Sequence, residues 1–433
     1  MQEFFKFKEL NTNYKTEIIG GLTTFVTMAY VLAVVPKMLT NAGFDIHTAL
    51  VLVSISIIIS TLAMGIFTNR PFAIAPGLGS VAVAVSMVSE NSFSTGVMAG
   101  AIFLSGIIFM LVTFLGLRQL LINAIPPALK YAISASVGLY IAFIGARSAG
   151  LIVAGKKSLV WGDLASKGVL VCVFGFIILL ILQAKKVPAS IIISIILSTI
   201  LSILIGHSQM PSSFFALPMN PISAISQRIS EFDFLNSLSF SIIPFVIALF
   251  IPDFFSTFGT ILGVGTKAGF FDKNANMQGI DKCFKIDASA TAAAGVVGVP
   301  CLCTYLESSA GVVAGARSGF SMLVVSFCFL LAMFFTPLAI MVPSAASAPA
   351  IIYIGICMFM GINKINNDDF TEMFPVFVCV VFTILASNIA NGICVAIPVY
   401  VLLKIAKKDF SFSPLLYVMC FISFMYFYTL IAR

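Results

Sequence analysis

The strongest constraint on this chain is its series of long apolar runs separated by short polar loops. Seven runs precede a polar stretch at 207–236, and seven more follow with similar spacing. One helix crossing needs about 20 apolar residues. The pattern therefore predicts an all-α polytopic membrane protein with about 14 transmembrane segments. The runs lie near 17–38, 48–68, 72–89, 94–117, 128–146, 167–184 and 187–206, then near 238–264, 284–298, 301–315, 319–342, 345–361, 373–387 and 389–404, with a last run of ambiguous placement at 412–431.

Charged residues are too few to build a water-soluble surface. The 24 basic and 17 acidic residues make up 9% of 433 residues, whereas a soluble domain carries about 25%. This excludes a soluble enzyme, and the abundance of apolar residues excludes a disordered chain. The net charge of +7 comes from basic residues in short loops, which indicates membrane topology rather than nucleic-acid binding.

The distribution of the basic residues predicts how the chain is inserted. Most of them fall on one side if the N-terminus is cytoplasmic, as expected for a multi-pass protein of the plasma or inner membrane. Residues 1–16 form a polar cytoplasmic tail, and the next run lacks a cleavage site, so we expect a first crossing rather than a signal peptide. Because seven is odd, a second repeat at 237–433 is inverted relative to the first at 17–206. The stretch 207–236 becomes an extracytoplasmic connector. Inverted repeats are typical of transporters.

The third run of each series is interrupted by proline and glycine. One reads APGLGS at 75–80, and the other is entered through GVVGVPCLCT at 295–304. Such residues break a helix, and two breaks at matching positions of two halves point to a binding site at the membrane midplane. The alternative is that glycine and proline are simply commoner in membrane helices.

Three of the carboxylates lie in or at the edge of apolar runs, namely Asp253, Asp287 and Glu307. An ionised carboxylate at the centre of a membrane helix costs about 2.5–3.5 kcal/mol, so it needs a partner, a proton or a watery cavity. Glu307 is expected at a half-helix N-terminus, where it either binds a ligand or serves only as a cap. Asp287 follows Lys285 at a predicted helix start, where a cap or salt bridge accounts for it equally well.

Two hydroxyl residues accompany these features. Ser80 begins the half-helix after the first break, where its hydroxyl either caps the helix or donates to a ligand. Thr257 lies one turn after Asp253 and shares its helix face, although threonine hydroxyls also bond back to their own helix.

Other sites are not predicted. The nine cysteines lie mostly in apolar runs without metal-ligand spacing, and no phosphate-binding loop or catalytic motif occurs. We therefore expect no metal, no cofactor and no enzyme activity. Transport, if it is energised, would use an ion gradient.

In these residues the chain resembles the nucleobase–cation symporter-2 superfamily, in the AzgA-like branch of adenine, guanine and hypoxanthine permeases. The likeness covers nearly the whole chain, with several motifs in order at matching spacing. The motifs are EIIGGLTTFVTMAY (17–30), APGLG (75–79), DFFSTFGT (253–260), TKAG (266–269), TYLES (304–308) and AGARSG (314–319).

The resemblance implies two inverted sevens in which segments 3 and 10 are short strands followed by half-helices. Segments 1–4 and 8–11 would form a core domain. Segments 5–7 and 12–14, with the C-terminal segment, would form a gate domain. It also implies a secondary active importer of a purine nucleobase, generally proton-coupled, that works by alternating access of the core against the gate. The implied partners are the nucleobase, the proton and membrane lipid, with a homodimer as in many proteins of this fold.

Carried over by position, Asp253 and Glu307 match the acidic binding residues of the family, and one of them would carry the coupled proton. The family pattern has Asn where this chain has Val81, and a second Asp where it has Ser256. Substrate would lie between the two breaks and the eighth segment. The predicted substrate-binding residues are Glu307, Asp253, Ser80, Val81, Ser256, Thr257 and Thr304, and the predicted proton-coupling residues are Glu307 and Asp253.

Other functions stay open. Another nucleobase, such as uracil or xanthine, is an alternative substrate. An anion carrier on the same architecture is a second alternative, although the intramembrane charges are acidic. An intramembrane enzyme would need a cluster of catalytic residues that the apolar runs do not contain. A structural scaffold does not explain acids at membrane depth.

Overall fold

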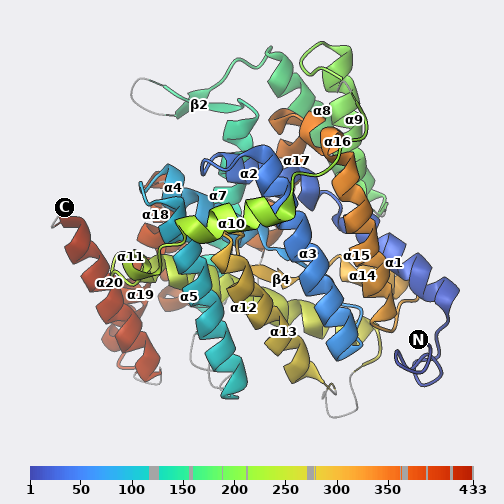
Figure 1. Cartoon of the computed structure of the whole chain (residues 1–433). Helices are drawn as coiled ribbons and strands as arrows, with labels where there is room; N and C mark the ends of the chain where they lie inside the picture. The colour runs from blue at the N-terminus through green and yellow to red at the C-terminus, as the bar shows by residue number, and fades with distance from the viewer. Residues whose placement is uncertain are drawn as a thin grey trace.

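The computed structural model describes residues 1–116, 126–155, 159–187, 189–210, 213–270, 277, 279–360, 362, 369–386, 389–409 and 413–431. Its helices and strands follow the predicted apolar runs in order, and the runs at 17–38 and 319–342 each contain more than one helix (Figure 1). The first repeat contains α1 (Tyr14–Met28), α2 (Val31–Thr40), α3 (Ile46–Thr68), β1 (Ile74–Pro76), α4 (Leu78–Ser89), α5 (Thr95–Phe114), α7 (Pro127–Ser148), α8 (Lys167–Ala184) and α9 (Ser190–Leu204). The second contains α12 (Ile243–Lys267), α13 (Ile280–Val296), β4 (Leu302–Thr304), α14 (Ser308–Val313), α15 (Phe320–Ala332), η1 (Met333–Phe335), α16 (Thr336–Met341), α17 (Ser344–Phe359), α18 (Phe370–Leu385) and α19 (Ile389–Ala406).

Six stretches of the described chain are long and apolar enough to cross a membrane, and shorter apolar helices supplement them. Several helices begin where a short polar side chain satisfies a free backbone N–H group. The carboxylate of Asp45 accepts the N–H of Thr48 at the start of α3, and Ser94 caps α5 in the same way. The six stretches are Tyr14–Thr40, Ile46–Thr68, Thr95–Phe114, Lys167–Ala184, Ile243–Ile261 and Phe320–Met341.

Both interrupted segments have the predicted form, a short strand followed by a helix. Strands β1 and β4 pair antiparallel, with Ile74 opposite Thr304 and Pro76 opposite Leu302. Beyond the pair, the N–H of Gly77 donates to the Cys301 carbonyl over 3.0 Å. The first half-helix, α4, has 12 residues and the second, α14, has only six. Strand pairing satisfies backbone groups that an interrupted helix leaves open within the membrane.

The helices pack in two groups, and each group contains matching parts of both repeats. In the first group α3 packs against α15, and the equivalent helices α13 and α5 pack against each other. A side chain at Gly106 of α5 would collide with the backbone of Ala292 on α13, so glycine permits this close approach. In the second group α7 packs against α17, while α8–α9 and α18–α19 form helical hairpins. This exchange of equivalent neighbours is what an inverted repeat produces.

Some elements differ from the sequence expectation. The stretch 207–236, for which no element was predicted, contains α10 (Pro221–Glu231) and the first residues of α11 (Phe234–Ser237). Helix α10 crosses the bundle transversely, in front of α3 and α5 (Figure 1). An exposed hairpin of β2 (Ile152–Ala154) and β3 (Leu159–Trp161) joins α7 to α8, and no apolar run signalled it.

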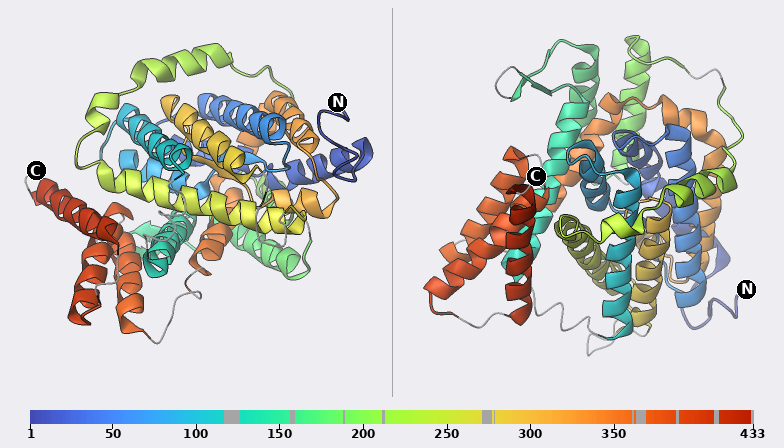
Figure 2. Two further views of the ribbon diagram at one scale, coloured as in Figure 1. Left: turned by 90° about the horizontal axis from the view of Figure 1, so that it is seen from below. Right: turned by 60° about the vertical axis from the view of Figure 1, so that its left-hand side comes forward.

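The last apolar run forms one helix, α20 (Pro414–Ile431), which packs against α19. Helices α18–α20 stand together at the side of the molecule opposite the N-terminus (Figure 2). One face of α20 is apolar and uncovered, with Phe421 and Phe424 exposed. Such a face is suited to contact with lipid.

Candidate functional site

The candidate site surrounds the paired strands, where α1 meets α2 and where α4 and α14 begin. Several side-chain contacts fix the two breaks to each other. The hydroxyl of Tyr305 donates to the Pro76 carbonyl over 2.5 Å, and the Ala73 N–H donates to the Ser308 hydroxyl over 3.0 Å. The two interrupted segments therefore form one unit, although they lie more than 200 residues apart in the chain.

Glu307 lies directly before α14 and is partly exposed. Its side chain makes no capping hydrogen bond to this helix. Instead its Oε1 accepts a 2.8 Å hydrogen bond from the hydroxyl of Tyr30, a residue 277 positions earlier that separates α1 from α2. Glu307 therefore occupies the N-cap position of α14 without a side-chain capping bond, and its role in ligand binding stays a prediction. Tyr30 was part of a quoted motif but had no predicted role, because its contact with Glu307 is purely tertiary.

Asp253 and Asp287 are both buried, on α12 and α13. The hydroxyl of Thr257 donates to Asp287 Oδ2 over 2.7 Å, and that of Thr291 lies 3.4 Å from Asp253 Oδ2. The second oxygen, Oδ1, of each carboxylate has no hydrogen-bond partner, and no ion pair reaches either carboxylate within the described part of the chain. Such a pair is costly to ionise fully.

The interpretation of Asp287 as a residue at a helix start needs correction. Helix α13 begins at Ile280, so Asp287 lies well inside it and faces Thr257 rather than a free helix end. The apolar run at 284–298 missed the first turn because Asp281 and Lys282 make that turn polar. A carboxylate in the middle of a helix cannot serve as its N-cap, and this position favours a functional role for Asp287.

The remaining predicted residues lie on both sides of the strand pair. Ser80 and Val81 are buried in the first turn of α4, and the Ser80 hydroxyl approaches the carbonyls of Gly77 (2.8 Å) and Cys301 (3.0 Å). The single hydroxyl proton is therefore shared between two backbone carbonyls, one from each interrupted segment. Thr304 is buried, and its N–H donates to the Thr257 hydroxyl over 3.2 Å. Ser256, in contrast, lies on an exposed part of α12.

A further buried carboxylate, Glu17, has a structural role that the sequence did not reveal. Its Oε1 accepts the backbone N–H groups of Arg317 (2.8 Å) and Ser318 (3.1 Å) and the hydroxyl of Thr12. These contacts join the start of α1 to the turn that follows α14. Glu17 therefore fixes the far end of the half-helix that Glu307 precedes.

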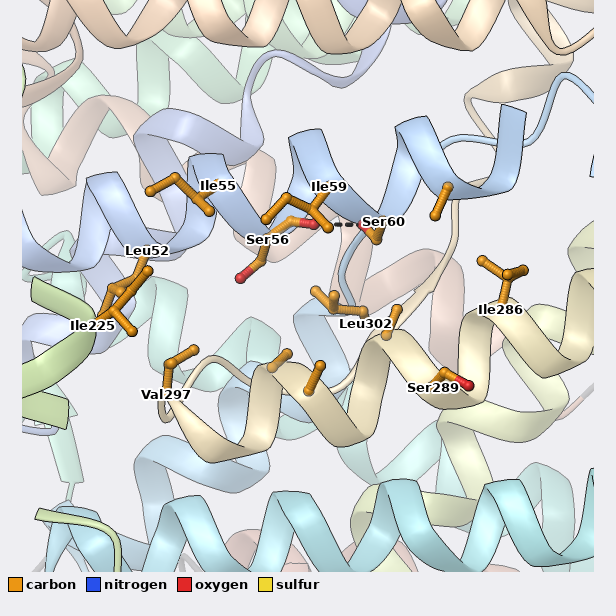
Figure 3. Close-up of a pocket in the computed structure, with 14 residues that line it drawn as sticks. Leu52, Ile55, Ser56, Ile59, Ser60, Ile225, Ile286, Ser289, Val297 and Leu302 are labelled. Atoms are coloured by element: carbon orange, nitrogen blue, oxygen red, sulfur yellow. Dashed lines mark hydrogen bonds between the residues drawn. The ribbon is translucent and has the colours of Figure 1, made fainter. Parts of the chain in front are cut away.

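An apolar groove of about 310 Å³ lies between α3 and α13, behind the strand pair. Figure 3 shows Ile55 and Ile59 of α3 facing Ile286 of α13 and Val297, the residue directly after that helix, with Leu302 at the strand. No carboxylate is among its lining residues, whose polar side chains are those of Ser56, Ser60 and Ser289. No cluster of three or more metal-ligating side chains occurs among the residues that the structure describes.

Fold and site together define a membrane transporter with a crossed pair of interrupted segments. The family model Xan_ur_permease, described as a permease family, matches residues 15–427. The chain therefore belongs to this permease family, of the nucleobase–cation symporter-2 type, and it is an integral membrane transporter rather than an enzyme.

Two of its relatives have names that state a substrate. The guanine/hypoxanthine permease PbuG of Bacillus subtilis is 34% identical over 99% of both chains. The adenine permease AdeQ of Escherichia coli is 33% identical over 94% of this chain and 90% of its own length.

Solved structures of transporters share the fold. The transmembrane domain of a cyanobacterial bicarbonate transporter, BicA, superposes with a TM-score of 0.59 at 15% identity, covering 88% of this chain and 97% of that domain. The murine solute carrier 26 family member A9, an anion transporter in an inward-facing state, gives a TM-score of 0.61 at 12% identity, covering 91% of this chain and 69% of that one. At these identities the likeness concerns the fold alone.

Proposed function

We propose that this chain is a secondary active importer of a purine nucleobase of the guanine, hypoxanthine or adenine class, coupled to protons. The observation that carries the proposal is Glu307, a partly exposed carboxylate that follows the strand pair, with two buried acids linked by threonines to the strand that precedes it. The named substrates of the relatives PbuG and AdeQ support the purine class.

Recognition would use the polar edge of the flat base. A carboxylate accepts two N–H donors from a heterocycle in one plane, and Glu307 offers this group beside the Tyr30 hydroxyl. Ser256 on α12 would contribute a small polar contact where the family pattern has a longer acid. Val81 is buried in α4 where the family pattern has an amide, so this position would offer the base no polar contact.

Proton coupling would involve Glu307, Asp253 and, beyond the sequence prediction, Asp287. Two buried carboxylates that have no basic partner among the described residues strongly disfavour double ionisation, so at least one proton or cation would accompany them. Asp253 and Asp287 are linked to β4 through Thr291 and Thr257. Protonation of either carboxylate would therefore change the hydrogen bonds that hold β4, the strand that leads to Glu307.

Transport would proceed by alternating access. The group of α1–α5 with α12–α15 would act as the core domain, and α7–α9 with α17–α19 as the gate domain. The contacts of α4 and α12 with α7 would change as the two move. We further propose a cytoplasmic N-terminus in the plasma or inner membrane, and a homodimer surrounded by lipid.

The decisive experiment is uptake of labelled bases in cells that lack their own permeases. Saturable uptake of adenine, guanine or hypoxanthine is expected, and it should fall when a protonophore collapses the proton gradient. Uracil, xanthine, bicarbonate and sulfate serve as competitors that separate the other nucleobases and the anions from the purine class. Absence of saturable purine uptake would overturn the proposed substrate. Proteoliposomes with either a pH gradient or a sodium gradient separate the two coupling ions.

A further inference from the structure

Each short strand is held from one side by a threonine of the preceding helix. The hydroxyl of Thr61 on α3 accepts the Ile74 N–H and donates to the Ile74 carbonyl, both over 3.0 Å. The hydroxyl of Thr291 on α13 accepts the Leu302 N–H over 3.1 Å and donates to the Leu302 carbonyl over 2.7 Å. Ile74 and Leu302 are the first residues of β1 and β4, and both threonines are buried. The two threonines thus satisfy the same backbone groups in the two repeats.

The two threonines differ in one neighbour. The Thr291 hydroxyl lies 3.4 Å from Asp253 Oδ2, whereas in the described part of the chain the hydrogen bonds of the Thr61 hydroxyl go to Ile74 alone. A threonine hydroxyl has a single proton. An ionised Asp253 competes with the Leu302 carbonyl for that proton. A protonated Asp253 donates to the Thr291 oxygen instead, and the Thr291 proton then stays on Leu302.

We propose that Thr291 is a positioning residue that couples the proton on Asp253 to the position of β4, and through β4 to Glu307. The inference rests on the proposed proton coupling of this site. Leu302 begins the strand that ends two residues later at Thr304 and leads directly to Glu307. A change in the hydrogen bond at the Leu302 carbonyl therefore acts on the strand that carries the substrate-binding carboxylate.

The other link between an acid and this strand is of a different kind. Thr257 accepts the Thr304 N–H and donates to Asp287, so its proton has one acceptor and no competing strand carbonyl. The titratable groups near Asp253 are Asp287 of α13 and the thiols of Cys301 and Cys303 at β4, with Glu307 beyond Cys303. The neighbouring helix α5 contributes the Ser105 hydroxyl, 3.7 Å from the Cys301 sulfur. Only Thr291 therefore divides one proton between an acid and the strand, within this set of groups.

The test compares Thr291→Val with Thr61→Val, which removes the same two strand hydrogen bonds without touching an acid. Both variants should lose thermal stability to a similar degree. The ratio of the purine KM at neutral pH to that at acidic pH should change roughly 3- to 10-fold in Thr291→Val, the range expected for one hydrogen bond, and stay unchanged in Thr61→Val. Thr291→Ser should restore the wild-type profile.

An unshifted pH profile in Thr291→Val, or an equal shift in Thr61→Val, would overturn the inference while leaving proton coupling intact. Wild-type uptake that does not depend on pH would instead overturn the coupling itself. If the valine variants do not reach the membrane, Thr291→Cys and Thr61→Cys keep a small side chain with a weak donor. The same difference in pH profile is then expected, and its absence contradicts the role of Thr291.

Discussion

The two interrupted segments share a backbone plan but differ in chemistry. Each has a short strand, a threonine that holds the first strand residue, and a helix that begins inside the membrane. In the first repeat the helix α4 is long, and Ser80 near its start bonds to protein carbonyls. In the second repeat α14 is short, and it is preceded by Glu307, whose carboxylate makes no capping hydrogen bond to this helix. The first segment thus builds the scaffold, whereas the second carries the charge. The same backbone serves both because strand pairing, not side-chain charge, stabilises the crossing.

The largest expected effect comes from removing the charge that only the second segment has. Glu307→Gln keeps the size of the side chain and the Tyr30 contact, but it replaces one acceptor oxygen with an NH₂ group, which only donates. We expect purine uptake to fall roughly 10- to 100-fold, the range for losing a charge-assisted hydrogen bond. The measurement is initial uptake rate at equal surface expression. Ser80→Ala, the matched change in the first segment, should have the smaller effect. The comparison fails if the two variants lose activity equally.

The buried acid pair gives the second prediction. Asp287→Asn and Asp253→Asn each remove one of two uncompensated carboxylates, so the folded protein should keep or gain thermal stability. The pH dependence of uptake should weaken in both variants. The measurements are melting temperature in detergent and the pH profile of uptake. Unaltered pH dependence in both variants would remove the pair from the coupling mechanism.

The turns that lead into the two strands offer a third comparison. Gly298 has φ +73° before β4, and Asn69 has φ +51° at the end of α3 before β1. Gly298→Ala should cost about 1 kcal/mol or more, because a left-handed backbone disfavours alanine and the new Cβ would lie 3.2 Å from the Arg228 side chain. Thermal unfolding measures this loss. Asn69→Gly should relax the backbone but lose the hydrogen bonds to Gly319 N–H and the Phe5 carbonyl. A neutral Gly298→Ala would show that the turn is not strained by a side chain.

The smallest effect is expected at the end of the chain that lies far from the strands. Hydrogen bonds from Thr371, and then the Lys407 ammonium group, lower the pKa of Asp369 to about 2. The carboxylate therefore stabilises the folded state above its unfolded pKa of about 3.9, and this contribution is lost as the pH falls toward 2. Asp369→Asn keeps the cap of α18, so unfolding at neutral pH should change by less than about 1 kcal/mol. Melting curves of both proteins at neutral and acidic pH should converge in acid. A difference that persists there would point to packing instead of charge.

Much of the fold was predictable from local sequence. The apolar runs match the helices because a membrane segment must satisfy its own backbone hydrogen bonds. The breaks at 75–80 and 295–304 were visible as proline and glycine in apolar surroundings. The positions of Asp253 and Glu307 stood out because acids are so rare in the runs. The hairpin β2–β3 and helix α10 were missed, since three-residue strands and an 11-residue surface helix are too short to give the pattern of a membrane crossing.

The residues that the sequence could not place are those whose partners are distant in the chain. Asp287 looked like a cap, and Glu17 looked like the edge of a run. Both are buried acids whose roles depend on Thr257 and on the turn at Arg317. Thr61 and Thr291 carried no signal alone, because threonine is common in membrane helices and usually bonds to its own backbone.

The sequence by itself determined the membrane class, the order of the segments and the two places where a helix cannot continue. These follow from hydropathy, from proline and glycine, and from the scarcity of charge, all of which act locally. The tertiary structure decided that β1 pairs with β4, that Tyr30 meets Glu307 and that only one of two equivalent threonines touches an acid. Those choices depend on how the inverted repeats pack, which brings together residues separated by much of the chain.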